Sequence, residues 1–336
     1  MTFADIGEHA LLARILGRLP RPSSSVLIGP GDDAAVLAPI RNERLVVTTD
    51  AVVEGVHFSR AYSTAADIGH KALAVNLSDL AAMAATPRWV VLSLVLPGVT
   101  PVTDVEELVD GLAALAACHG VSVVGGNITR TDGPMVVDVT AGGEVAPRRW
   151  LTRSGALAGH DVYVSGRIGG AAAGLEMLAA GRGSGIGDQG SGCIARHRRP
   201  EPRVRLGMAM GRARAARAAM DLSDGLADAL RQVAAASGVG VRIDADALPI
   251  EPAAREWWTS RGIDPVAAAI KGGDDYELIF AVPAKGRGPL RSVMRHVADP
   301  PLTKIGSFTK DPREVVLTRG TKADALPEGF EHFANR

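Results

Sequence analysis

Two hydrophobic patterns alternate along the chain. Short runs of apolar residues are typical of buried strands, and longer segments with apolar residues every three or four positions are typical of helices. Their alternation predicts an α/β fold of the α+β type. The predicted strands lie at 45–49, 89–96, 121–124, 135–141, 162–165, 239–243, 277–282 and 314–317. The predicted helices lie at 6–19, 65–84, 102–119, 170–180, 202–215, 224–237 and 289–296.

A change in this pattern predicts two domains. The run 135–145 completes a strand, and Gly155 and Asp161 then introduce a new unit of strand, loop and helix. The 336 residues are enough for two domains of about 150 residues each. We therefore expect an N-terminal domain at 1–148 and a C-terminal domain at 149–336.

The stretch 181–192 is rich in Gly and Ser and has almost no apolar residue beyond Ile186. This composition predicts a surface loop. Such loops can also close over an active site as lids, and the sequence leaves that alternative open.

The balance of charge argues against two kinds of partner. The chain has 37 basic residues (Lys and Arg) and 37 acidic residues (Asp and Glu). Because these charges balance, the protein has no strong net electrostatic field that would attract nucleic acid or an anionic membrane. The longest strongly apolar run, 89–96, is far shorter than the roughly 20 residues that span a bilayer. Charged residues among the first 19 positions predict an amphipathic helix and not a secretory signal.

The two cysteines, Cys118 and Cys193, are far apart, which argues against a disulfide framework or a zinc site. We expect a cytoplasmic protein.

Five short segments place acidic side chains beside Gly or Ser. Carboxylates that lie close together repel one another unless cations sit between them, and Mg²⁺ prefers oxygen ligands. Because most of these segments follow strand-like runs, they predict one site, built from several strand ends, that holds metal and polyphosphate. The segments are 29–33 (GPGDD), 48–50 (TTD), 76–79 (NLSD), 221–225 (DLSDG) and 272–275 (GGDD).

Each segment alone also has an ordinary structural explanation. Segment 29–33 suits a tight turn, and the polar positions of 76–79 suit an ion-paired helix as well as a buried polar face. Ser223 suits the N-cap of the following helix, although a helix N-terminus also favours phosphate. The glycines of 125–127 (GGN) would allow close approach to a phosphate or form a plain turn. The chain has no Walker A or protein-kinase motif, so phosphoryl transfer would need another scaffold.

Taken in order, these motifs resemble those of the thiamine-monophosphate kinases, a family in the aminoimidazole-ribonucleotide-synthetase-like superfamily. The match runs through nearly the whole chain, and the number and order of its motifs make it specific. The matching segments are GPGDDAAVL (29–37), TTDAVVEGVHF (48–58), HKALAVNLSDLAAMAATP (70–87), VVGGNITR (123–130), LTRSGALAGHDVYVSG (151–166), RHRRPEPRVRLG (196–207), MDLSDGLADAL (220–230), GGDDYELIF (272–280) and GFEHF (329–333).

The resemblance implies ATP-dependent conversion of thiamine monophosphate to thiamine diphosphate with several Mg²⁺ ions. It implies a homodimer paired through an N-terminal domain that binds ATP and Mg²⁺, with a C-terminal domain that completes the nucleotide and substrate site. The implied metal ligands are Asp33, Thr48, Thr49, Asp50, Asp79, Asp221 and Asp224, with Asp32 as an additional candidate. The implied ATP contacts are Gly126, Asn127, Arg153 and Ser223, and the implied substrate contacts are His57, Asp274 and Phe330.

The chain departs from the family pattern at two positions. Asn127 stands where the family usually has aspartate, so its amide oxygen can coordinate a metal but offsets no charge. Asp274 stands where the family commonly has glutamate, which shortens the side chain by one methylene. The number of bound Mg²⁺ ions is therefore left open.

The resemblance also implies a mechanism. The acceptor phosphate has a second pKa of about 6, so it is largely dianionic at neutral pH and needs no general base. Its repulsion from the γ-phosphate would be offset by Mg²⁺, Arg153 and Lys71, which favours direct in-line transfer. Two other interpretations stay open: a purine-pathway cyclo-ligase of the same superfamily, against which the GFEHF segment argues, and a nucleotide-binding regulator without turnover.

Overall fold

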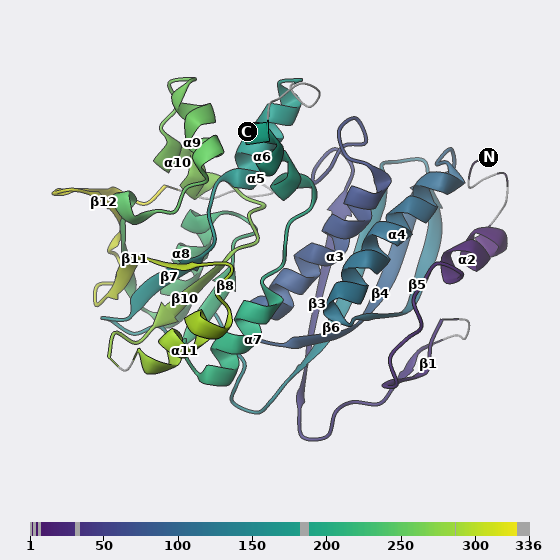
Figure 1. Ribbon diagram of the computed structural model, residues 1–336, viewed down its shortest axis with the longest axis horizontal. Coiled ribbons are helices and arrows are strands. Elements are labelled where there is room, and N and C mark those ends of the chain that lie inside the picture. The colour runs from purple at the N-terminus through teal and green to yellow at the C-terminus, as the bar shows by residue number, and fades with distance from the viewer. Residues whose placement is uncertain are drawn as a thin grey trace. The chain divides into compact units, whose positions relative to one another are not determined.

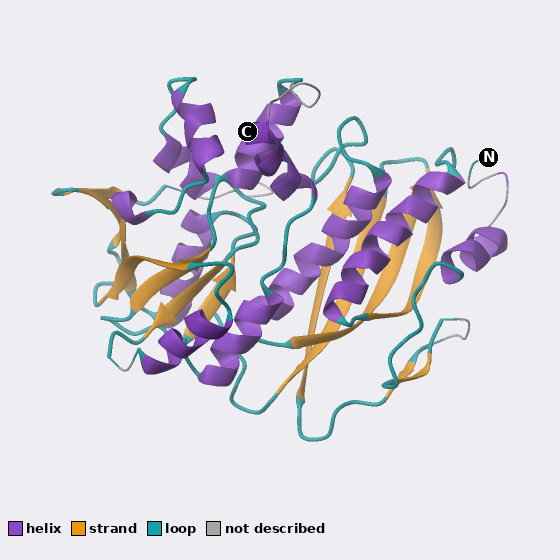
Figure 2. Ribbon diagram, viewed as in Figure 1, coloured by secondary structure: helices purple, strands orange, loops and turns teal. Residues whose placement is uncertain are grey.

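The computed structural model describes residues 2, 5, 8–30, 34–181, 188–285 and 287–327. The chain divides into two compact units. The N-terminal unit comprises 1–80 and 85–147, and the C-terminal unit comprises 81–84 and 148–336. Each contains helices and a β-sheet (Figures 1 and 2), so the predicted mixed α/β architecture is confirmed.

A four-stranded sheet forms the centre of the N-terminal unit. Its strand order is β3-β6-β4-β5, and β4 runs parallel to β5 but antiparallel to β6. Helices α3 and α4 lie against one face of this sheet (Figures 1 and 2). The elements are α2 (Glu8–Leu16), β1 (Val26–Ile28), β2 (Val36–Leu37), β3 (Arg44–Val53), α3 (Ala65–Ala82), β4 (Thr86–Pro97), α4 (Val102–His119), β5 (Ser122–Thr131) and β6 (Val136–Val145).

Two glycines allow α3 and α4 to approach each other closely. A Cβ atom on Gly69 would lie 1.8 Å from the carbonyl oxygen of Leu108, and one on Gly111 would lie 2.0 Å from that of Ala66. Any side chain at either position would push the helices apart. Helix α4 ends at Gly120, whose φ of 66° is in the left-handed region that glycine adopts without strain.

A seven-stranded sheet forms the centre of the C-terminal unit, in the order β13-β12-β9-β11-β7-β10-β8. Only β12 and β9 are paired in parallel in this sheet, as far as the structure describes it. Every residue of β7, β8 and β10 is buried. The strands are β7 (Asp161–Ser165), β8 (Ala218–Asp221), β9 (Gly240–Asp244), β10 (Leu278–Val282), β11 (Leu302–Thr309), β12 (Val315–Arg319) and β13 (Lys322–Ala325). The helices are α5 (Gly170–Ala179), α6 (Asp188–Arg198), α7 (Val204–Ala213), α8 (Leu226–Ser237), α9 (Pro252–Thr259), α10 (Pro265–Lys271) and α11 (Gly288–His296), with a 3₁₀ turn at Ala245–Ala247.

Several elements differ from the sequence prediction. The stretch 181–192, expected to be a loop, is helical from Asp188 onward as the start of α6, and residues 182–187 lie outside the described part. Strands β3 and β5 extend past the acidic and Gly-rich segments that were expected to follow them. Strand β8 was missed because its sequence, Ala-Ala-Met-Asp, has low strand propensity and is a strand only through pairing with β10.

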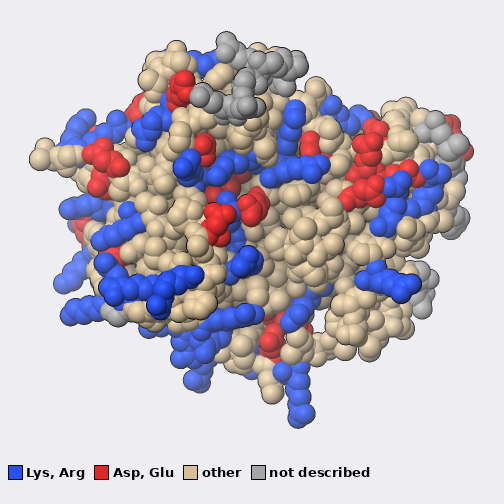
Figure 3. Space-filling model, viewed as in Figure 1, with Lys and Arg blue, Asp and Glu red and all other residues tan. Residues whose placement is uncertain are grey.

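Within the described residues, no helix is long and apolar enough to cross a membrane. On the face shown in Figure 3, acidic and basic side chains are interspersed in the upper half, whereas basic side chains predominate in the lower half.

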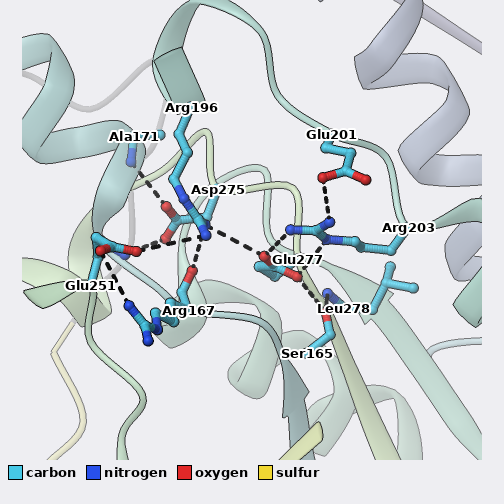
Figure 4. Close-up of polar contacts among 11 residues, drawn as sticks. Ser165, Arg167, Ala171, Arg196, Glu201, Arg203, Glu251, Asp275, Glu277 and Leu278 are labelled. Carbon is cyan, nitrogen blue, oxygen red and sulfur yellow. Dashed lines mark hydrogen bonds and ion pairs between the residues drawn. The ribbon is translucent and has the colours of Figure 1, made fainter. Parts of the chain in front are cut away.

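A buried polar network fixes the segment that leads into β10 (Figure 4). The carboxylate of Glu277 is fully buried and accepts hydrogen bonds from Arg203 Nε and Nη2, at 2.8 and 2.6 Å, and from Ser165 Oγ at 2.6 Å. Ser165 Oγ also accepts a bond from the Leu278 amide at 2.9 Å. Burial lowers the pKa of Arg203, but hydrogen bonds and charge from Glu277 outweigh it, so the pKa stays above its usual value.

Asp275 is the second buried acid of this segment. Its two oxygens accept hydrogen bonds from the backbone N–H groups of Gly169 and Ala171, at 2.6 and 3.1 Å, at the start of α5. Burial raises the pKa of Asp275 to about 7, against the effect of these two hydrogen bonds. Both Asp275 and Glu277 are thus engaged by the protein itself.

We expect Glu277→Gln to destabilise the protein by about 3 kcal/mol, because it leaves the buried Arg203 charge without its main partner. Glu314→Gln is the matched control: the Glu314–Arg242 pair is solvent-exposed, and its loss changes the stability by less than about 1 kcal/mol. Denaturant unfolding of both variants measures the difference. Equal effects from the two substitutions would contradict the anchoring role of Glu277.

Candidate active site

Two acidic segments of the C-terminal unit lie side by side. Strand β8 pairs antiparallel with β10, with Asp221 opposite Leu278. Three main-chain bonds continue this pairing beyond the strands: Leu222 N–H to Glu277 O at 2.8 Å, Tyr276 N–H to Leu222 O at 3.0 Å, and Asp274 N–H to Ser223 O at 2.7 Å. The segments 221–225 and 272–275 therefore form one connected structure, which we call the paired acidic loops.

The paired acidic loops hold four of the predicted site residues. Asp221 is buried at the end of β8, and Ser223, Asp224 and Asp274 are half-buried. Ser223 is not the N-cap of α8, because the helix begins after Gly225, whose φ is 94°. That positive φ turns the chain between Ser223 and the helix, so the serine stays in the loop beside Asp274.

In the N-terminal unit, the side chains of segment 48–50 are divided between the two faces of β3. Thr48 Oγ1 donates a hydrogen bond to Asp79 on α3, so Thr48 and, two residues on, Asp50 face the helices. The side chain of Thr49 points to the opposite face, where its Oγ1 lies 3.0 Å from Thr140 Oγ1. The three residues cannot all bring their side chains to one metal in this unit.

Asn76 gives an independent indication of a ligand near Asp50 and Asp79. The residue is fully buried on α3, and its Nδ2 donates to Ala72 O at 3.0 Å and lies 3.5 Å from Asp50 O. Its Oδ1 is buried and has no hydrogen-bond partner among the described residues. A buried carbonyl oxygen left in this state is costly unless a cation or water meets it.

The donors around this point suit Mg²⁺, because carboxylate, hydroxyl and amide oxygens are its preferred ligands. The described residues contain no ready-made group of three acidic, His or Cys side chains that would hold a metal alone.

Lys71 and His57 lie next to each other in the N-terminal unit. Lys71 is buried on α3, and its Nζ donates to the carbonyl oxygen of His57 at 2.9 Å. His57 Nδ1 accepts a bond from the Val53 amide at 3.1 Å, so a neutral His57 carries its proton on Nε2. Lys71 therefore holds the segment that carries His57; its predicted part in charge neutralisation stays a prediction.

Gly126 and Asn127 lie at the opposite edge of the sheet from Thr48 and Asp50. One row of paired residues crosses the four strands and consists of Gly126, Leu92, Val139 and Asp50. Three strand spacings, about 14 Å in total, separate the two ends of that row. Among the described residues, Gly126 and Asn127 are therefore not adjacent to Asp50 and Thr48 within one chain.

Glycine is needed at position 126 for packing between strands, and not for the predicted approach of a phosphate or a turn. A Cβ atom there would lie 2.1 Å from the carbonyl oxygen of Leu92, so glycine is required by the close approach of β5 to β4. Asn127 is exposed, and its Nδ2 donates to Thr129 Oγ1 at 2.9 Å. Residues 125–128 also line a cavity of about 350 Å³, together with apolar side chains of α2 and β4 and with Leu19, Pro30 and Val123.

The other predicted residues fall into two groups. Arg153, in the C-terminal unit, is exposed and donates a hydrogen bond to Gln232. Asp32, Asp33 and Phe330 lie outside the described residues.

Sequence reasoning missed two residues that contact Asp274. Tyr276 donates a hydrogen bond from its hydroxyl to Asp274 Oδ1 at 3.2 Å, and His197 Nδ1 lies 3.4 Å from Oδ2. Tyr276 is only two residues away and belongs to the same motif, which was a usable signal. His197 is far away in the sequence, and nothing in its local pattern connects it with Asp274.

Comparison with known proteins places the chain in a family. Residues 31–145 match the AIR synthase related protein N-terminal domain, and residues 158–318 match the corresponding C-terminal domain. Thiamine-monophosphate kinase of Escherichia coli (strain K12) is 39% identical over 332 residues, which is 98% of each chain. The crystal structure of thiamine-monophosphate kinase from Stenotrophomonas maltophilia K279a is 42% identical, with a TM-score of 0.81 over 93% of this chain and 96% of that one.

A further solved structure, AaThiL complexed with AMPPCP and TMP, is 31% identical, with a TM-score of 0.74 over 96% of this chain and 98% of that one. Full-length similarity at this level, across both matched domains, confirms the resemblance seen in the motifs. The chain therefore belongs to the AIR synthase related protein family and, within it, to the thiamine-monophosphate kinases.

Proposed function

We propose that this protein transfers the γ-phosphoryl group of ATP to the phosphate of thiamine monophosphate, producing thiamine diphosphate. The full-length relationship to thiamine-monophosphate kinases carries this conclusion. The relative described as a complex with AMPPCP and TMP holds an ATP analogue and the same acceptor. Each unit supplies oxygen atoms of the kind that such a reaction requires: the paired acidic loops in the C-terminal unit, and the Thr48–Asp79 contact in the N-terminal unit.

The acceptor is its own nucleophile, because a phosphate monoester is largely dianionic at neutral pH. The residues near the site then need to bind and orient two anions, not to remove a proton. Arg153 is exposed and can reach a phosphate, and Ser223 offers a hydroxyl donor beside Asp224. We infer direct in-line transfer on this basis.

We propose that Asp50 and Asp79, with Thr48, hold Mg²⁺ in the N-terminal unit, and that Asp221 and Asp224 hold Mg²⁺ in the C-terminal unit. When bound, Mg²⁺ supplies positive charge that lowers the repulsion between the two substrates. Asn76 would meet the bound ion or its water with its unpartnered Oδ1. Asn127, as a neutral amide, contributes no charge of its own, so we expect less metal at that edge than in relatives with aspartate there.

The cavity beside Gly126 and Asn127 suits the adenine of ATP. Its walls include Leu12 and Ile15 of α2 and Leu92 of β4, which provide apolar surface for a flat ring. The exposed edge of β5 offers polar main-chain groups close by.

We infer a homodimer from the face of the four-stranded sheet that α3 and α4 leave uncovered. On β3, Leu45 and Val47 are 61% and 54% exposed, and they lie on the face opposite to Thr48. Exposed apolar side chains on a sheet with two open edges favour association. If two sheets close into a symmetric barrel, β5 of one subunit adjoins β3 of its partner. That arrangement would place the strand that carries Gly126 and Asn127 next to β3 of the partner.

The competing interpretations are less well supported. A purine-pathway cyclo-ligase would share the acidic motifs, but the relatives that match 98% of the chain are thiamine-monophosphate kinases. The interpretation as a nucleotide-binding regulator without turnover was based only on the neutral side chain of Asn127. We also propose a cytoplasmic location, which fits two cysteines that are both free.

An ADP-release assay tests the proposed function. We expect rapid ADP formation with thiamine monophosphate, ATP and Mg²⁺, and background release with unphosphorylated thiamine, which lacks the dianionic nucleophile. Chelation of Mg²⁺ should abolish the rate. Equal ADP release with both acceptors would contradict the function.

Val47→Asp tests the homodimer. We expect the wild type to have twice the 34.8 kDa mass of the chain by light scattering, and the variant to be monomeric because it buries a charge in the interface. Val99→Asp is the control, since Val99 is 75% exposed between β4 and α4. A monomeric wild type, or a dimeric Val47→Asp, would exclude this interface.

A further inference from the structure

The carboxylate of Asp274 is contacted on both oxygens by side chains that have no assigned role. The Tyr276 hydroxyl donates to Oδ1 at 3.2 Å, and His197 Nδ1 lies 3.4 Å from Oδ2. Both of these residues are buried, at 6% and 3% exposure, whereas the Asp274 side chain is 26% exposed. The carboxylate is thus held from the protein interior while part of it remains accessible.

The backbone at Asp274 and Tyr276 has a strained conformation, and this conformation accompanies the contact between their side chains. Asp274 and Tyr276 have φ values of 67° and 48°, which are unfavourable for residues with a side chain. Such conformations persist where the surroundings determine them. Here Asp275 and Glu277 are anchored in the buried network and alternate with the two strained residues.

His197 is tied to the same segment through its neighbour. Arg196 Nη1 donates to Arg167 O at 3.1 Å and lies 3.6 Å from Glu277 Oε1, while Nη2 lies 3.7 Å from Glu251 (Figure 4). The end of α6 is therefore fixed relative to Glu277, three residues after Asp274. The distance between His197 and Asp274 is set by this connection.

We propose that Tyr276 and His197 are positioning residues that orient the Asp274 carboxylate toward the rings of thiamine monophosphate. This inference rests on the proposed function. A carboxylate repels the acceptor's phosphate but attracts the cationic thiazolium ring and accepts a hydrogen bond from the aminopyrimidine. A carboxylate already held in place loses less conformational freedom on binding, so the contact strengthens affinity for the acceptor.

Tyr276→Phe removes only the hydroxyl and keeps the ring at the same φ. We expect it to raise the KM for thiamine monophosphate roughly three- to tenfold, the effect of loosening one hydrogen bond to a charged group. The KM for ATP should change less than about twofold, as expected for a residue that acts through a carboxylate proposed to contact only the acceptor. Tyr163→Phe, on the neighbouring strand β7, is the matched control and should alter neither KM.

A double-mutant cycle separates positioning from general destabilisation. Asp274→Gly removes the carboxylate, and glycine accepts the positive φ. Tyr276→Phe should have no further effect in that background if it acts through Asp274. A full additional effect, or an equal rise of both KM values, would overturn the proposal.

His197 is tested by two substitutions with different chemistry. Asn keeps an N–H donor near the position of Nδ1, whereas Ala removes it. We expect His197→Ala to raise the KM for thiamine monophosphate and His197→Asn to restore most of the loss; equal defects in the two variants would overturn the role of His197. Calorimetric affinity for thiamine monophosphate gives the same comparison without turnover. A wild type that binds this acceptor but does not phosphorylate it would contradict the proposed function, and the affinities would still decide the positioning roles.

Discussion

The arrangement of the predicted site residues in the C-terminal unit depends on the pairing of β8 with β10 and on the three main-chain bonds that continue it. These bonds connect residues about fifty positions apart and fix two acidic loops against each other. Gly273 permits this approach, because a Cβ atom there would lie 2.6 Å from Ser223 O. Asp221, Ser223, Asp224 and Asp274 are then held by the backbone and do not depend on a ligand to bring them together.

The acidic residues of this part of the chain form two classes, which differ in burial and in the groups that contact their carboxylates. Within the protein, Asp275 accepts hydrogen bonds from two backbone N–H groups, and Glu277 pairs with the guanidinium of Arg203. Asp274 and Asp224 are half-buried and closer to solvent. The first class anchors the loops, and we propose that the second class contacts substrate and metal. An acidic segment in a sequence can thus combine anchoring residues with candidate ligands.

The sequence alone predicted the long elements well and the site incompletely. Helix α4 was expected at 102–119, where it is found, because it combines a clear helical period with a C-terminal glycine. Strand β8 could not be predicted, since it is stabilised by β10 and not by its own residues. The side chains of Thr48 and Thr49 point to opposite faces of the sheet. This follows from the alternation of side chains along a strand, but only once β3 is known to continue through both residues. The distance between Gly126 and Asp50 requires the strand order, which no local pattern contains.

The central claim is that the predicted acidic residues, among them Asp50 and Asp224, bind the Mg²⁺ that accompanies ATP. Calorimetric titration of Mg²⁺ in the presence of a non-hydrolysable ATP analogue tests it most directly, with Asp50→Asn and Asp224→Asn compared with the exposed control Asp311→Asn. We predict that each of the first two variants weakens Mg²⁺ binding at least about tenfold and that the control does not. Wild-type Mg²⁺ affinity in both Asp50→Asn and Asp224→Asn would contradict the account.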